Sequence, residues 1–176
     1  MSAPTRRRFL GLAGTALIAG LAGCASSVPF VGGPPAVRQE SGDTVKRRLP
    51  IPFAEETPTP FAALVVGKSG TQTHQVWVWN RTGERREIKV GIGPGGSQNP
   101  WFERSYDFEP ESVLAMELRK SRKYGIGIAV GNRSKTVGVP RSQFDCNESA
   151  TDVLVEEGKT RSQTVQTSMG CGGEWF

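Results

Sequence analysis

Histidine and cysteine are scarce in this chain of 176 residues, which contains one His and three Cys. A blue-copper site needs two His ligands with a free Cys and usually a Met, so a chain whose single imidazole is His74 cannot build one. A Ser-His-Asp triad would also have to use His74, and no serine lies in a Gly-x-Ser-x-Gly elbow. No Asp-x-Asp-x-Asp-Gly run indicates a calcium loop. We therefore expect no enzymatic activity and no cofactor, and we expect His74 to be a structural residue at the edge of a strand.

Long apolar runs and an excess of one charge are missing as well. The longest apolar stretch, Phe9 to Leu21, spans thirteen residues, which is short of the roughly 20 that a membrane-spanning helix needs. The formal net charge is +5, but without Arg6, Arg7 and Arg8 the chain has 19 Lys and Arg against 17 Asp and Glu. This mixture is typical of a solvated surface and argues against a nucleic-acid partner.

The first 23 residues predict an export signal. A charged segment, the apolar stretch and a run of small residues follow one another in the order of a signal peptide. Arg6, Arg7, Phe9 and Leu10 match the twin-arginine signature of paired arginines, one free position and then Phe-Leu. Proteins that use this route usually cross the membrane already folded.

The apolar stretch ends on Leu21-Ala22-Gly23-Cys24, which matches a lipobox. Its small residues suit the signal peptidase, and the Cys24 thiol would accept a diacylglyceryl group before cleavage. The sequence therefore predicts a signal peptide over residues 1–23 and a chain that is held by the Cys24 lipid on the extracytoplasmic face of the cell membrane.

A tether is predicted over residues 24–60. Seven of the twelve prolines lie between residues 25 and 60, and no apolar period is sustained there. The basic run Lys46-Arg47-Arg48 is expected to be solvated in this tether rather than bound to lipid headgroups.

From residue 61 to residue 176 the pattern changes to alternation with a period of two, which is typical of half-buried strands. Turn residues separate these runs, and no stretch of about twelve residues keeps a helical period. We predict an all-β domain, an antiparallel immunoglobulin-like sandwich of about seven to nine short strands. The strand candidates are 62–66, 75–79, 88–92, 101–108, 114–118, 124–130, 136–139, 151–155 and 160–167.

The two remaining cysteines predict a disulfide. If Cys24 carries lipid, Cys146 and Cys171 form an even pair in an oxidising compartment. The strand candidates between them form a polar hairpin, whose ends would bring the two Cα atoms together. The alternative is that each thiol is buried and free.

A glycine-rich run and three sequons also need interpretation. The segment Gly91-Ile92-Gly93-Pro94-Gly95-Gly96 matches G-x-G-x-x-G, but no helical period follows it to receive a pyrophosphate. We therefore expect a connecting loop and no nucleotide. Asn80, Asn132 and Asn147 each begin an N-x-S/T sequon at an expected strand end or loop, and they are candidate N-glycosylation sites.

The chain resembles the haloarchaeal-type surface lipoproteins that are exported by the twin-arginine route. The matching parts are residues 5–10, residues 21–24, the turn at 108–112 before an alternating strand, Tyr124 at the start of the next strand, and the late pair Cys146 and Cys171. The resemblance implies a Pro- and Thr-containing linker that carries an immunoglobulin-like β-sandwich.

Two functions remain open on these grounds. The first is a non-enzymatic, lipid-anchored envelope module with a structural, adhesive or accessory-subunit role. Its candidate contact surfaces are the smooth outward strip Gly125, Gly127, Ala129 and Gly131, unless the sheet face is covered, and the terminal Trp175-Phe176. The second is a solute-binding lipoprotein that serves a membrane transporter. A pocket of several hundred cubic ångströms lined by Trp77, Trp79 or Trp101 would favour it.

Overall fold

The computed structural model describes residues 33–54, 56–97 and 99–168, and these residues form an all-β domain. Two short 3-10 turns, η1 (Gly42–Thr44) and η2 (Arg141–Gln143), interrupt the strands. The strands are β1 (Val37–Glu40), β2 (Ala62–Val66), β3 (His74–Arg81), β4 (Arg86–Pro94), β5 (Phe102–Phe108), β6 (Val113–Leu118), β7 (Tyr124–Val130), β8 (Arg133–Val139), β9 (Ser149–Glu156) and β10 (Lys159–Gln166).

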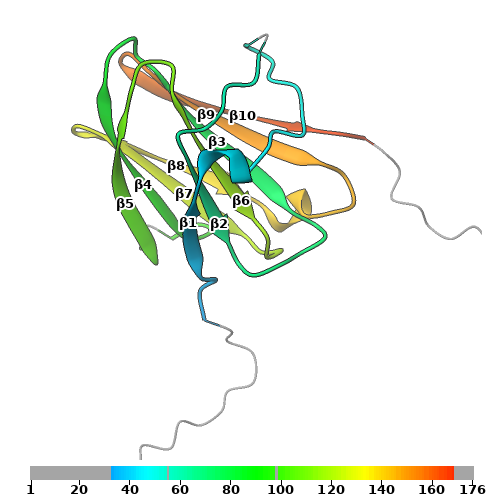
Figure 1. The fold of residues 1–176 in the computed structure, drawn as a ribbon. Helices are drawn as coiled ribbons and strands as arrows, with labels where there is room; N and C mark the ends of the chain where they lie inside the picture. Colours follow the sequence, from blue (N-terminus) through cyan, green and yellow to red (C-terminus); the bar gives the residue numbers. More distant parts are fainter. Residues whose placement is uncertain (1–32, 55, 98, 169–176) are drawn as a thin grey trace, which may run out of the picture. The chain divides into compact units, whose positions relative to one another are not determined.

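The strands form two sheets (Figure 1). The larger sheet has six strands in the order β1-β2-β6-β3-β9-β10, and the smaller has four in the order β5-β4-β7-β8. Neighbours are antiparallel except in the larger sheet, where β2 runs parallel to β6 and β3 runs parallel to β9. The prediction of an antiparallel architecture is therefore confirmed for most pairings and wrong for these two.

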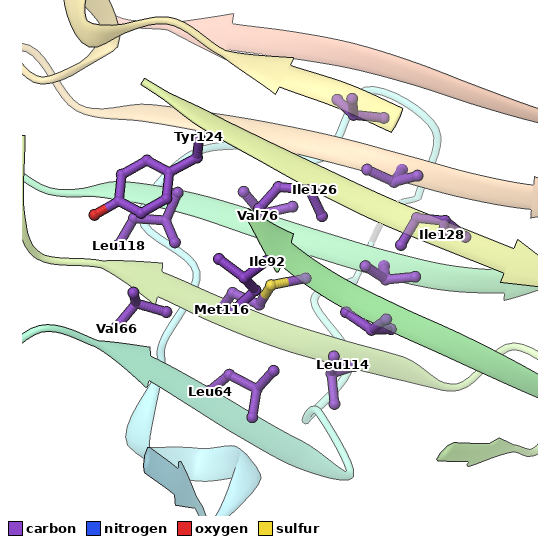
Figure 2. Close-up of a cluster of buried hydrophobic side chains, with 14 of the residues drawn as sticks. Leu64, Val66, Val76, Ile92, Leu114, Met116, Leu118, Tyr124, Ile126 and Ile128 are labelled. Carbon is purple, nitrogen blue, oxygen red and sulfur yellow. The ribbon is translucent and has the colours of Figure 1, made fainter. Parts of the chain in front are cut away.

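Alternation along the strands places one face of each sheet in a shared core. In the middle of β4 and β7 the even-numbered residues, such as Ile92 and Ile126, are buried. Figure 2 shows these two side chains in one cluster with Val76 and Met116 of the larger sheet. Because one face of each strand is buried in this way, a register shift of one residue would expose the whole apolar set of that strand.

The strand candidates from the sequence are confirmed. Each of the nine predicted segments overlaps one of the strands β2 to β10, and the predicted turns separate them. The predicted number of seven to nine is nevertheless too low, because β1 adds a tenth strand within the described residues.

Residues 33–54 belong to the domain, so the prediction of an unstructured tether up to residue 60 is wrong for this stretch. β1 pairs with β2 at the edge of the larger sheet. The chain then crosses the outer face of that sheet, where Val45 and Ile51 pack with Trp77 and Trp79. Proline removes a backbone donor and so disfavours a sheet ladder, but it does not prevent a segment from packing through its side chains. We call residues 41–54 the covering segment.

A buried ion pair fastens the covering segment to the sheet. Arg47 donates to both carboxylate oxygens of Asp152 in β9, at 2.7 and 2.9 Å, and the two side chains are 1% and 0% exposed. Asp152 also accepts a bond from Trp79 Nε1 at 3.1 Å, and Arg47 Nε donates to the Leu49 carbonyl at 2.9 Å. The expectation that Arg47 is solvated is therefore wrong, because this network replaces the water that both charges lose on burial.

We predict that Arg47→Met lowers the free energy of unfolding by about 3–5 kcal/mol, because it leaves the Asp152 carboxylate buried without a counter-ion. Urea unfolding of the chain measures this change. Arg85→Met is the matched control, since Arg85 and Asp107 form an exposed pair that should contribute less than about 1 kcal/mol. Equal effects of the two substitutions would contradict the role given to Arg47.

Candidate functional site: a glycine groove on the smaller sheet

The outer face of the smaller sheet is floored by glycines. The outer face of β4 and β7 carries Gly91, Gly93, Gly125 and Gly127, each next to a buried isoleucine, and the register places Gly91 opposite Gly127 and Gly93 opposite Gly125. Since these four residues carry no side chains, they leave an open groove of about 410 Å³ on the sheet. We call this feature the glycine groove.

The β4 half of the groove corrects one sequence interpretation. Gly91 and Gly93 continue the strand as far as Pro94, so the expected connecting loop is wrong for residues 91–94 and right only for the turn after them. The alternation of Ile88, Val90 and Ile92 extends into this run and was the signal for a strand.

The glycines of the groove floor differ in how much space there is for an added side chain. A Cβ atom at Gly93 would lie 3.1 Å from Pro100 Cα, and one at Gly125 would lie 3.1 Å from the Pro94 carbonyl oxygen, so a larger residue at either position would require the neighbouring backbone to shift. A Cβ atom at Gly127 would meet nothing nearer than 3.9 Å. The glycine at this position therefore keeps the groove open without being needed for packing.

Polar side chains border the floor. Lys89 of β4 forms an ion pair with Glu103 of β5, with Nζ and Oε1 3.2 Å apart, and both side chains are about half exposed. Ser134 and Thr136 of β8 line the groove on its other side. The groove therefore presents bare backbone between two hydrogen-bonding borders. Its other lining residues are Ser97, Pro100, Ile128, Ala129 and Lys135.

A smaller pocket lies on the larger sheet. It holds about 240 Å³ beside the covering segment, with Trp77 in its wall. Trp77 is fully buried, and within the described part of the chain its Nε1 has no hydrogen-bond partner. Trp79 and Trp101 do not line this pocket. Its volume is below the roughly 300–1,000 Å³ of typical small-molecule sites, so it matches the pocket expected for solute binding only in part.

His74 is the first residue of β3, a central strand of the larger sheet, and it is fully buried. Nδ1 lies 2.7 Å from Ser149 Oγ, whose proton goes to the Gln143 carbonyl, also at 2.7 Å. Nε2 lies 2.9 Å from Thr151 Oγ1. These partners assign the proton to Nδ1, with Nε2 accepting from the threonine. Because the Ser149 hydroxyl donates to a backbone carbonyl, His74 does not act on it as a base, and its place is structural.

Burial, together with the smaller effect of the nearby positive charge of Arg47, lowers the pKa of His74 from its ordinary value of 6.5 to about 4. The imidazole is therefore neutral in the folded protein at neutral pH, which agrees with the assigned hydrogen bonds.

The three candidate glycosylation sites differ in accessibility. Asn80 is fully buried, and its Nδ2 donates to three backbone carbonyl oxygens at 2.7, 3.2 and 3.1 Å. The prediction is therefore wrong for Asn80, because the folded protein offers no free amide nitrogen there. Asn132 is exposed in the turn between β7 and β8, and Asn147 is partly exposed before β9. Glycosylation at these two positions stays a prediction.

The structure brings together the ends of the hairpin that the cysteines flank. Gln166 lies opposite Ser149, and the Thr167 amide donates to the Glu148 carbonyl at 2.9 Å, next to the loop that holds Cys146. The predicted disulfide stays a prediction, because its second member lies outside the described residues. The predicted residues that lie outside them are Arg6, Arg7, Phe9, Leu10, Cys24, Cys171, Trp175 and Phe176.

Within the described residues, no three His, Cys, Asp or Glu side chains are grouped so that they could hold a metal ion. No helix in this part of the chain is both long and apolar enough to cross a bilayer. No family model and no curated protein matches the chain.

We predict that His74 makes stability depend on pH. The unfolded chain takes up a proton near pH 6.5 and the folded chain only near pH 4, so stability is full above pH 6.5 and decreases as the pH falls to 4, by up to about 3 kcal/mol. Urea unfolding across this range measures the slope.

His74→Gln is the matched variant, because it retains hydrogen-bonding groups without titrating. The carboxylates contribute equally to both proteins, so the difference between the two slopes isolates His74. The same pH dependence in both proteins would contradict the assignment.

Proposed function

We propose that this chain is a lipid-anchored, extracytoplasmic envelope module without enzymatic activity, and that it uses the glycine groove to hold an extended segment of a partner protein in a structural, adhesive or accessory-subunit role. The export signal and the lipobox at Cys24 support the location. The two packed sheets support an immunoglobulin-like sandwich in its general layout, although the parallel pairs β2–β6 and β3–β9 depart from the antiparallel scheme.

The glycine floor is the observation that carries the binding role. The four glycines on two adjacent strands carry no side chains. Gly91, Gly93 and Gly125 are buried, but Gly127 is partly exposed and an added Cβ there would meet nothing nearer than 3.9 Å, so another chain can approach closely at this point. Lys89, Glu103, Ser134 and Thr136 supply donors and acceptors along the borders. A flat floor between polar borders suits an extended main chain, which carries a regular series of such groups.

The chemistry of a compact organic ligand suits the groove less well. Small-molecule sites are usually lined by apolar and aromatic side chains, and the groove has backbone in their place. The solute-binding alternative is supported by the unpartnered Nε1 of Trp77 beside the smaller pocket. We rank it second because of the limited volume of that pocket.

We predict that Gly127→Val abolishes partner binding. Its side chain enters the groove from a position where a Cβ atom meets nothing within 3.9 Å, and Val is favoured in strands, so the fold should be retained. The measurement is affinity purification of the intact lipoprotein from its own membrane, followed by identification of the chains that co-purify.

Gly138→Val is the matched control, since Gly138 is also a strand glycine with nothing within 4 Å of an added Cβ, and it does not line the groove. A partner should co-purify with this control and with the unsubstituted chain, at least about tenfold more than with Gly127→Val, which corresponds to a loss of about 1.4 kcal/mol. Equal recovery with both variants would exclude the groove as the binding surface.

We predict that Cys24→Ser leaves export intact but blocks lipid attachment, because a hydroxyl cannot replace the thiolate as the acceptor of the diacylglyceryl group. Mass analysis of the chain recovered from the membrane fraction shows whether lipid is present. A lipidated, membrane-bound Cys24→Ser protein would contradict the assignment of the anchor.

A further inference from the structure

The two ends of the sandwich differ in charge. β1 begins at Val37, opposite the last residue of β2, so the chain enters the domain at the end where β2 and β6 finish and β7 begins. We call this the proximal end, and the opposite end, where β3 finishes and β4 begins, the distal end.

Four basic residues gather in two neighbouring loops of the proximal end. Lys68 follows β2, and Lys120, Arg122 and Lys123 connect β6 to β7. The loops touch, since Arg119 Nη1 donates to the Lys68 carbonyl at 3.4 Å and the Lys120 Cβ lies 3.6 Å from where a Cβ of Gly67 would be. The three lysines are exposed, while Arg122 is half-buried, with its guanidinium 5.0 Å from the Trp101 ring centroid. We call these four residues the proximal cluster.

None of the four members of the proximal cluster forms an ion pair with another described residue. The nearby Glu117 is already bound by Arg48 and by Arg119. The other acids of this end, Asp145 and Glu148, lie in the loop before β9, which is two strands away from β6 in the sheet order.

The distal end shows the opposite behaviour, because its basic side chains form ion pairs with nearby acids, with the exception of Arg133 at the start of β8. A group of several unpaired basic residues is therefore found at the end at which the chain enters. The distal pairs are Arg81–Glu111, Arg85–Asp107, Arg85–Glu109, Arg86–Glu84, Arg86–Glu157, Lys159–Glu156 and Arg161–Glu156.

Chain length limits how far the proximal end can lie from the anchor. Eight residues separate Cys24 from Gly33, the first described residue. Nine residue steps span at most about 30 Å when fully extended, at roughly 3.4 Å for each step. The distal end is a further strand length away, about 25 Å for strands of seven or eight residues. The unpaired cations thus lie at the end whose distance from Cys24 the chain length limits most.

We propose that the proximal cluster docks the domain on the anionic headgroups of the membrane that holds its lipid. This inference rests on the proposed anchoring at Cys24. The two acyl chains of a diacylglyceryl group would hold the chain at the membrane without orienting the domain, and a basic surface adds attraction to anionic headgroups of about 1 kcal/mol for each residue close to them. Docking at the proximal end also leaves the outer faces of both sheets, and with them the glycine groove, pointing along the membrane plane.

The test uses the full lipidated chain, reconstituted into vesicles of phosphatidylcholine alone or with phosphatidylglycerol, and labelled with a membrane-impermeant amine acetylating reagent at about 0.1 M salt. Each basic residue held at an anionic surface increases the affinity of the domain for that surface about fivefold. Because several basic residues act together, the docked state should predominate on the anionic vesicles, and Lys68, Lys120 and Lys123 should label there at least about tenfold more slowly. Distal Lys159 should label equally on both. In 1 M salt, where the Debye length is about 3 Å, the protection should disappear.

The double variant Lys120→Glu, Lys123→Glu should remove the protection of Lys68, whereas the distal control Lys159→Glu should keep it. Equal labelling of the lysines of the proximal cluster on both kinds of vesicle would overturn the inference. So would protection that persists in 1 M salt, or protection given by a soluble anionic polymer but not by the anionic vesicles. Mass analysis before labelling separates the two claims. A chain without lipid on Cys24 would overturn the proposed anchor and this inference with it, whereas a lipidated chain that labels equally would overturn the inference alone.

Discussion

The domain depends on one buried charge pair, Arg47 with Asp152. Neither charge can lie at an apolar sheet face alone, because the cost of removing an ion from water is recovered only when its partner and the remaining hydrogen bonds are in place. Asp152 can therefore occupy the centre of the larger sheet only while the covering segment supplies Arg47. The same segment brings Val45 and Ile51 over Trp77 and Trp79, which would otherwise form an exposed apolar patch. Residues from the first third of the chain thus cover a sheet that also contains the last two strands, β9 and β10.

The strands were predictable because their signal is local. Half-buried strands alternate with a period of two wherever they lie, so runs such as 88–92 and 124–130 could be located without knowledge of their neighbours. Sheet order, the two parallel pairings and the number of strands are properties of distant contacts, and no window of sequence contains them. β1 has only four residues, of which two are exposed, so its alternation is too short to recognise. The prolines between residues 25 and 60 led to the prediction of a tether, so neither β1 nor the covering segment was expected.

The β7 side of the glycine groove was predictable from the sequence, whereas the β4 side was predictable only in part, again because only local patterns can be recognised. Gly125, Gly127 and Ala129 belong to an alternating run and could be assigned to an outward strip, whereas Gly93 lay beyond the strand predicted over 88–92, in a run that resembled a phosphate-binding loop. Burial of polar groups was the least predictable property. The sequon at Asn80 is a local motif, whereas the three carbonyls that occupy its amide come from residues up to 29 positions away. The partners of His74 are 75 and 77 positions away.

The pairing of β3 with β9 has a consequence for when this domain can form. β3 is a central strand, and the neighbour that completes it begins 75 residues later, at Ser149. Contacts of such long range slow folding, because the entropy of closing a large loop is lost before the contacts are gained. During synthesis, one side of β3 stays unsatisfied until nearly the whole domain has left the ribosome. Until β9 has been synthesised, the chain therefore keeps an open, aggregation-prone strand edge and cannot reach its native state.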